Sequence, residues 1–254
     1  MKVVILAGGF GTRLSEETQN IPKPMVRIGD KPILLHIMNW YAKFGYNEFI
    51  IAAGYKSEVI KEYFYNFASH NNDFQVNLLN GEVTQLNVKT PDWKVSVIDT
   101  GLNTMTGGRV KRLEKYIGNS SFMLTYGDGL SDVNLKSLLE KHKNSNAYLT
   151  LTSVRPTARF GEILTTTEGK ITSFKEKPQL DQGEISGGFF VCEPEIFQMI
   201  DDDNTIFEKE PMERIVNSGK MYAYKHAGFW QSMDTLREKQ LLDSIWTKGD
   251  APWA

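Results

Sequence analysis

The clearest chemical pattern in the sequence stands near the N-terminus, where an apolar run leads into glycines and then into basic residues. The segment Leu6-Ala7-Gly8-Gly9-Phe10-Gly11-Thr12-Arg13 has three glycines within four positions, and Lys23 follows ten residues later. Glycine lets a backbone approach a ligand closely, and successive backbone N–H groups can surround phosphate oxygens. An arginine fork and a lysine ammonium would add charged hydrogen bonds to the same phosphates. The spacing therefore predicts a phosphate-binding loop after a β-strand.

Three other interpretations of this loop compete with phosphate binding. A dinucleotide-binding fingerprint needs a third glycine that opens a helix, and here Leu14 follows Arg13 instead. A P-loop closes with Gly-Lys-Ser or Gly-Lys-Thr, and the segment lacks that ending. The glycines could also do no more than relieve strain in a tight turn. The two basic residues, Arg13 and Lys23, favour the phosphate-binding interpretation.

Two aspartates are candidate ligands for a metal ion. Asp128 lies in Tyr126-Gly127-Asp128-Gly129, at the end of an apolar run, and open α/β sheets bind ligands at the carboxyl ends of their strands. Asp234 directly precedes a helical pattern. Mg²⁺ that serves phosphate chemistry takes only one or two protein carboxylates. Each residue also has an ordinary interpretation, because Asp-Gly is a common turn and Asp a common helix N-cap.

The elements expected to position these residues alternate between strand and helix. In the first half, strands are predicted over 3–6, 48–53, 94–99, 122–126 and 148–154, and helices over 32–44, 57–67, 104–116 and 135–143. In the second half, strands are predicted over 162–165, 170–176, 188–192 and 221–226, and helices over 194–200, 207–217 and 235–246. Residues 71–93 are polar and interrupt this order, which predicts a ribbon or insertion. The fold class is therefore α/β: a Rossmann-like mixed, mostly parallel sheet flanked by helices, with a small β-ribbon insertion.

Length and composition exclude several classes of protein. A chain of 254 residues predicts a single domain over 1–254. The net charge of −2 gives no basic excess for binding nucleic acid. One cysteine allows no internal disulfide and suits a reducing compartment. The apolar run Val3–Leu6 is too short for a signal peptide or a membrane span, so we expect a cytoplasmic protein that contacts no membrane.

Taken together, these segments resemble the sugar-1-phosphate nucleotidylyltransferases over essentially the whole chain. A narrower resemblance to the cytidylyl-transferring members rests on Ser15-Glu16-Glu17-Thr18 and on the segments 99–109, 125–129, 159–161, 187–190, 228–231 and 233–235. Two positions depart from the family pattern. Ser186 replaces the usual Asn, which could reroute one sugar contact, and Ser232 replaces the usual Pro, which affects loop rigidity.

The resemblance divides this domain into a nucleotide-binding half over about 1–130 and a sugar-binding half over about 131–254. It also implies the substrates, the cofactor and the role of each site residue. CTP and α-D-glucose 1-phosphate would give CDP-glucose and pyrophosphate with Mg²⁺ as cofactor, and the product would feed deoxysugar synthesis for surface polysaccharides such as the lipopolysaccharide O-antigen. Leu6, Ala7, Gly8 and Gly9 would meet the base and ribose, Gly11, Thr12 and Arg13 the triphosphate, and Thr104 and Arg109 the nucleotide. Lys23 would lie beside the phosphates, and Asp128 and Asp234 would hold Mg²⁺. Glu176 would hold a sugar hydroxyl, Lys177 would hold the sugar phosphate, and Gly161 would line the sugar pocket. The implied catalytic set is Arg13, Lys23, Asp128, Lys177 and Asp234.

Other functions remain open at this point. The same reaction could use dTTP, UTP or another hexose 1-phosphate, because the choice of base depends on a few contacts that spacing does not reveal. A catalytically silent domain that senses nucleotide or sugar is a different class, and it would need fewer of the charged residues. An NAD-dependent oxidoreductase is a more distant alternative. The family also implies a homo-oligomer, in which the insertion over 71–93 could reach the nucleotide site of a neighbouring subunit.

Overall fold

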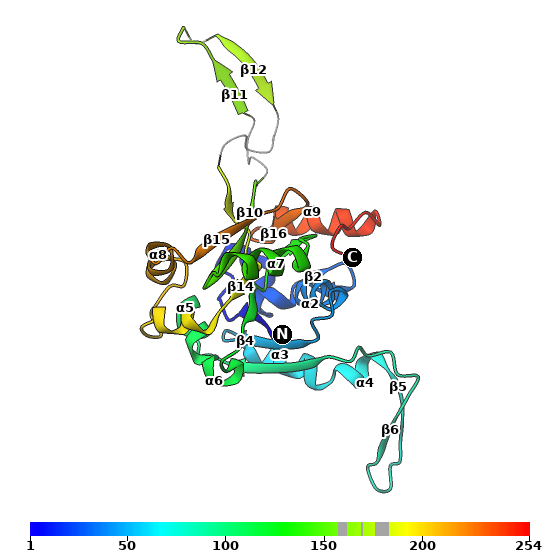
Figure 1. Cartoon of the computed structure of the whole chain (residues 1–254). Helices are drawn as coiled ribbons and strands as arrows, with labels where there is room; N and C mark the ends of the chain where they lie inside the picture. The colour runs from blue at the N-terminus through cyan, green and yellow to red at the C-terminus, as the bar shows by residue number, and fades with distance from the viewer. Residues whose placement is uncertain (157–161, 169, 176–182) are drawn as a thin grey trace.

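The computed structural model describes residues 1–156, 162–168, 170–175 and 183–254, built around one large sheet (Figure 1). The strands of this sheet run in the order β13 (Ile185–Ser186), β10 (Leu149–Val154), β14 (Phe190–Cys192), β8 (Phe122–Tyr126), β1 (Val3–Ala7), β4 (Glu48–Ala53) and β7 (Lys94–Asp99), with β15 (Met221–Lys225) beside β10. The pairs β8–β1, β1–β4, β4–β7 and β10–β15 are parallel, and the pairs that involve β13 and β14 are antiparallel. The predicted mixed, mostly parallel sheet is confirmed.

The order of the strands creates a crevice beside β1. The chain leaves β1, passes through α2 (Ile33–Lys43) to β4 on one side, and later returns to β8 on the other side. Ligands in open α/β sheets bind at such a switch point, off the carboxyl ends of the strands. The backbone N–H of Gly127 donates to the carbonyl of Leu6 at 2.9 Å, so the segments that follow β1 and β8 begin side by side.

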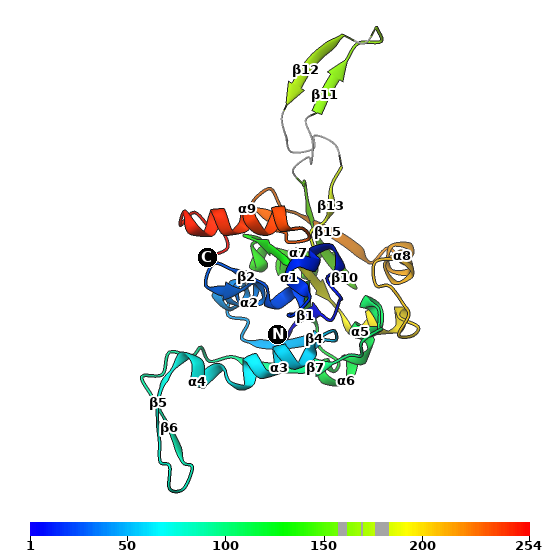
Figure 2. The ribbon, with the colours of Figure 1, turned by 180° about the vertical axis from the view of Figure 1, so that it is seen from behind.

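Helices cover both faces of the sheet and thereby make a three-layered molecule (Figures 1 and 2). One core joins one face of the sheet to α2, α3 (Ser57–Tyr65), α7 (Leu135–Ser145) and α9 (Leu236–Thr247). The other joins the opposite face to α5 (Thr106–Arg112), α6 (Glu114–Ile117), the 3₁₀ helix Pro194–Met199 and α8 (Glu210–Asn217). Alternate residues of β1 enter the two cores, which explains why Val3–Leu6 is apolar without interruption. Cys192 is fully buried in the second core.

Several predicted helices have different limits in the structure. The helix predicted over 104–116 begins only at Thr106 and is divided into α5 and α6. The first turn of this predicted helix is a loop instead. A distant segment holds the loop in place, because the N–H of Met105 donates to the carbonyl of Asp203 at 2.8 Å. The helix over 57–67 divides into α3 and α4 (Phe67–Asn71), and the one over 207–217 starts at Glu210. The segment predicted as a helix over 194–200 is a 3₁₀ helix.

Two antiparallel ribbons extend away from the layered body in both views (Figures 1 and 2). The ribbon of β5 (Asp73–Val76) and β6 (Val83–Leu86) confirms the insertion predicted over 71–93. The second ribbon joins β11 (Glu162–Thr165) and β12 (Ile171–Lys175), two strands that the sequence predicts without indicating that they leave the main sheet. Among the described helices, none is both long and apolar enough to span a membrane.

Candidate active site

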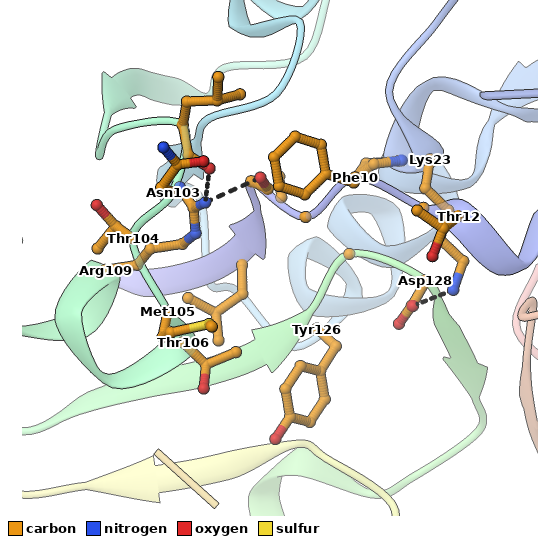
Figure 3. Close-up of a pocket in the computed structure, with 18 of the residues that line it drawn as sticks. Phe10, Thr12, Lys23, Asn103, Thr104, Met105, Thr106, Arg109, Tyr126 and Asp128 are labelled. Atoms are coloured by element: carbon orange, nitrogen blue, oxygen red, sulfur yellow. Dashed lines mark hydrogen bonds and ion pairs between the residues drawn. The ribbon is translucent and has the colours of Figure 1, made fainter. Parts of the chain in front are cut away.

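Two neighbouring cavities lie at the carboxyl ends of β1 and β8. The larger has a volume of about 550 Å³ and lies between the glycine-rich loop, the loop over 102–106 and the segment over 126–128 (Figure 3). The smaller, of about 230 Å³, lies on the side of β13 and β16 (Trp230–Ser232). Both are lined by Arg13, Tyr126 and Asp128, so a group held at these side chains would face both cavities.

The glycine-rich loop follows β1 directly, as predicted, and two of its glycines have a clear structural need. A Cβ atom at Gly8 would lie 2.2 Å from Nη1 of Arg109, so only glycine fits beneath that side chain. Gly11 has φ +66°, a left-handed conformation, and its carbonyl accepts a hydrogen bond from the N–H of Leu14 at 2.9 Å. Gly9 has open space beside it, and the Phe10 side chain is 46 % exposed. The loop therefore presents backbone and one exposed ring to the larger cavity.

Arg109 is a buried clamp between the segments that surround the larger cavity. Its side chain donates hydrogen bonds of 2.7–3.3 Å to oxygens of Gly8, Ala53, Thr100, Gly101 and Leu102. Burial lowers the pKa of this guanidinium, and the charge of Asp99 opposes that effect. Arg109 and Thr104 both line the cavity, as the resemblance implies. The hydrogen bonds of Arg109, however, hold the two loops to each other across the base of the cavity (Figure 3).

A short strand pair that the sequence does not predict brings the two aspartates together. β9 (Gly129–Ser131) pairs with β16, and Ser232 lies opposite Gly129. The N–H of Met233 then donates to the carbonyl of Asp128 at 2.8 Å. Because Asp128 directly precedes β9 and Asp234 closely follows β16, the two residues emerge at the same end of this pair. Each strand has only three residues, too few for a recognisable alternating pattern.

The carboxylate of Asp234 is free to face the cavity because a different residue caps the following helix. Thr235 is the N-cap of α9, and Thr235 and Glu238 form a capping box. The side chain of Glu238 accepts hydrogen bonds from the N–H groups of Asp234 and Thr235, at 2.7 and 2.8 Å. The ordinary interpretation of Asp234 as an N-cap is therefore wrong.

Four charged side chains meet where the two cavities join. Nζ of Lys23 lies 2.6 Å from Oδ2 of Asp128 and 2.7 Å from Oδ1 of Asp234. Nη2 of Arg13 lies 3.0 Å from the same Oδ1 of Asp234. The side chains of Lys23 and Asp234 are 10 % and 16 % exposed, whereas that of Arg13 is 70 % exposed. The structure thus gathers residues from the glycine-rich loop, the 3₁₀ turn that begins at Lys23, the segment after β8 and the segment before α9.

Two members of this cluster, Lys23 and Asp234, have pKa values that shift in the directions expected for ion pairs. Burial by itself lowers the pKa of Lys23, but the charges and hydrogen bonds of Asp128 and Asp234 outweigh burial and raise it. Burial raises the pKa of Asp234, and Lys23 together with Arg13 reverses this effect and lowers it. Lys23 and Asp234 are therefore held in their charged forms near neutral pH.

The same cluster shows that the two aspartates suit a divalent cation. Both carboxylates already converge on one cationic atom, Nζ of Lys23. In the described part of the chain, no group of three or more His, Cys, Asp or Glu side chains could hold a metal ion. Two carboxylates are nevertheless sufficient for Mg²⁺ when phosphate and water supply the remaining ligands.

The smaller cavity contains both residues that depart from the family pattern. Ser186 and Ser232 line it, together with Gly187, Phe189 and Trp230. Nε1 of Trp230 donates to the carbonyl of Gly187 at 2.7 Å and links two of the segments that line this cavity. Ser232 belongs to β16, so strand pairing restrains this position, which usually holds a proline in the family. Gly161, Glu176 and Lys177 lie outside the described residues.

A hydrogen-bonded group of polar side chains lies beside the cavities, and the sequence does not predict it. Tyr126 Oη donates to one carboxylate oxygen of Glu208, and Oγ1 of Thr106 donates to the other at 2.7 Å. Burial, followed by the charge of Glu208, raises the pKa of Tyr126 well above its usual range. Tyr126 is the first residue of the motif that contains Asp128, and this position is a signal for a lining role. No motif marks Glu208.

The chain is similar to known proteins over its full length. The chain is 47 % identical to the glucose-1-phosphate cytidylyltransferase of Salmonella typhimurium over 254 residues, which cover all of this chain and 98 % of that protein. It is 42 % identical to the probable glucose-1-phosphate cytidylyltransferase of Bacillus subtilis, with 100 % of this chain and 99 % of that protein covered. Among solved structures, HddC from Yersinia pseudotuberculosis superposes with a TM-score of 0.69 at 24 % identity, over 96 % of this chain and 99 % of that one.

The sequence model described as nucleotidyl transferase matches residues 2–237, nearly the whole chain. This match includes the glycine-rich loop and both aspartates. The chain therefore belongs to the nucleotidyl transferase family.

Proposed function

We propose that this protein transfers the cytidylyl group of CTP to α-D-glucose 1-phosphate, giving CDP-glucose and pyrophosphate. Relatives with the name glucose-1-phosphate cytidylyltransferase match it over its full length at 42–47 % identity. The observation that carries the proposal is the meeting of Arg13, Lys23, Asp128 and Asp234 between two cavities of unequal size. The larger cavity suits the nucleotide, the smaller one suits the sugar, and the charged cluster lies where their phosphates would meet.

The reaction needs no nucleophile from the protein. An oxygen of the sugar phosphate bonds to the α-phosphorus of CTP, and the bond from that phosphorus to the bridging oxygen breaks, so that pyrophosphate leaves with the electron pair. A phosphate monoester has a second pKa of about 6 and is already anionic near neutral pH. No general base is then required, and catalysis consists of positioning and charge stabilisation.

The residues of the site would divide this work. The backbone of the glycine-rich loop would surround the triphosphate, and Arg13 and Lys23 would neutralise charge on the phosphates. Asp128 and Asp234 would hold Mg²⁺, which when bound supplies further positive charge at the phosphates. From the resemblance, we assign a sugar hydroxyl to Glu176 and the sugar phosphate to Lys177.

Pyrophosphate release tests this function and its base specificity together. Purified protein with Mg²⁺ and glucose 1-phosphate is expected to release pyrophosphate with CTP far faster than with dTTP, UTP, ATP or GTP. Release that is fastest with another nucleotide would retain the mechanism and refute the choice of cytosine. If all five nucleotides are inactive, a panel of other hexose 1-phosphates is tested next. Release with one of them would indicate an altered sugar site at Ser186, whereas a silent sensing domain would bind CTP without turnover.

We further propose that the protein is a homo-oligomer and that the β5–β6 ribbon packs against a second copy. Every residue of β5 and β6 is exposed, and the loop between them carries Leu78 and Leu79 at 89 % and 95 % exposure. Strand pairing places Val76 opposite Val83, which are also exposed. An isolated two-stranded ribbon is only marginally stable in water, and exposed apolar patches commonly mark contact sites.

Light scattering provides the test of this contact. The wild-type protein is expected to have the mass of two or more chains, and the double variant Leu78→Asp/Leu79→Asp is expected to be smaller. Ile171→Asp is the matched control, because Ile171 is a 57 % exposed apolar residue of the other ribbon. A wild-type protein that is a fully active monomer would contradict the proposal.

A further inference from the structure

An internal cation lies between the two aspartates that we assign to the metal. Nζ of Lys23 is within 2.6 Å of Asp128 and within 2.7 Å of Asp234, and its side chain is 10 % exposed. Arg13 adds a second cation to the same oxygen of Asp234, at 3.0 Å. A divalent ion that binds both carboxylates would have to take the place of this ammonium.

We propose that Lys23 is an internal competitor of the metal, so that a divalent cation binds well only together with the nucleotide. This inference rests on the proposed function, because it takes Asp128 and Asp234 as the metal ligands. It assigns Lys23 a role in the empty enzyme, besides the contact with phosphate that the sequence predicts. In the empty enzyme Lys23 neutralises the carboxylates, and in the loaded enzyme it would turn to the phosphates.

Charge balance supports this exchange. The two carboxylates and the cations of Lys23 and Arg13 sum to zero in the empty site. A divalent ion that arrives alone would leave an excess of two positive charges in a confined space, which is unfavourable at short distance. The nucleotide brings several negative charges, so the displaced cations find new partners on its phosphates. Metal and nucleotide would therefore strengthen each other's binding.

The local structure allows the exchange without movement of the backbone. Lys23 begins a 3₁₀ turn (Lys23–Met25), and the N–H groups of Met25 and Val26 donate to the carbonyls of Pro22 and Lys23, at 2.8 and 3.0 Å. The main chain at Lys23 is thus fixed, whereas the four-carbon stem of a lysine is flexible. Lys23 and Asp128 lie on the side of the larger cavity opposite Arg109 (Figure 3). Rotation of the stem would carry the ammonium from the carboxylates into the space left for phosphates.

Equilibrium dialysis with Mn²⁺ tests the inference without relying on turnover. In the absence of nucleotide, Lys23→Met and Lys23→Gln are expected to bind Mn²⁺ at least about tenfold more tightly than the wild-type protein. Arg13→Met should tighten binding less, because Arg13 contacts one carboxylate and is more exposed. Lys111→Met is the matched control: Lys111 forms an ion pair with a single carboxylate, that of Glu114 at 3.0 Å, and lines neither cavity. It should leave Mn²⁺ affinity unchanged.

A second arm with CTP separates this inference from the proposed function. CTP should increase the Mn²⁺ retained by the wild-type protein, and Asp128→Asn or Asp234→Asn should remove that increase. If the aspartate variants retain Mn²⁺ normally, the metal site itself is misassigned. If they lose Mn²⁺ but the two Lys23 variants bind it no more tightly than the wild type without CTP, the role proposed for Lys23 is refuted and the metal site stands.

Discussion

Replacing Asp234 by asparagine is expected to lower kcat by at least about 100-fold, the size of effect seen when one preorganised electrostatic group is removed from an active site. The substitution removes the charge with little change in shape. It leaves Lys23 with Asp128 alone and takes from Arg13 its partner at 3.0 Å. The Thr235–Glu238 capping box does not involve the Asp234 side chain, so α9 should be retained. Steady-state kinetics over a range of Mg²⁺ concentrations measure the effect.

The matched control for Asp234 is an ion pair outside the site. Asp201→Asn also takes a carboxylate from an arginine, since Asp201 lies 2.7 Å from Arg214 and lines neither cavity. It should leave kcat within about twofold, because exposed ion pairs contribute little. Near-wild-type kinetics of Asp234→Asn at limiting Mg²⁺ would contradict the assignment of this residue as a metal ligand.

Replacing Arg109 by methionine is expected to destabilise the protein by at least about 2 kcal/mol and to raise the KM for CTP. Each buried polar group that loses its partner costs about 1–3 kcal/mol, and Arg109 donates to oxygens of five residues around the larger cavity. The glycine-rich loop and the loop over 102–106 would lose the link between them, so the cavity would be less preorganised for the nucleotide. Urea unfolding and initial-rate kinetics provide the two measurements.

A neighbour on the same helix serves as the control for Arg109. Arg112 is also in α5, but it pairs with Asp203 at the surface, with both side chains about half exposed. Arg112→Met should change stability by no more than about 1 kcal/mol and leave the KM for CTP unchanged. Equal effects of the two substitutions would mean that Arg109 is an ordinary helix residue and no clamp.

Local sequence patterns were sufficient to predict those strands and loops whose limits depend mainly on their own residues. The strand over 48–53 has the predicted limits because the segment is buried in the sheet, and the strand over 122–126 likewise. The glycine-rich loop could be placed because it follows an apolar strand directly. These features predict the sheet, the crevice and one wall of the larger cavity.

What local patterns could not predict are contacts between distant segments. The approach of Asp128 to Asp234 depends on a pair of three-residue strands, and the start of α5 depends on a hydrogen bond from Met105 to Asp203. The Lys23 ion pairs follow from the same long-range assembly. The resemblance to the family suggested the roles of these residues. Their positions relative to one another become clear only in the folded structure.

The burial of Cys192 makes the molecule convenient for site-specific labelling. Cys192 is the single cysteine of the chain, it is fully buried, and burial raises the pKa of its thiol, so it should react poorly with maleimides. A cysteine introduced at Ile171, which is 57 % exposed in the β11–β12 ribbon and lies outside the proposed subunit contact, would then carry a fluorophore or spin label selectively. In the proposed homo-oligomer, spectroscopic distances between labels on different chains could then be measured without first removing a native thiol.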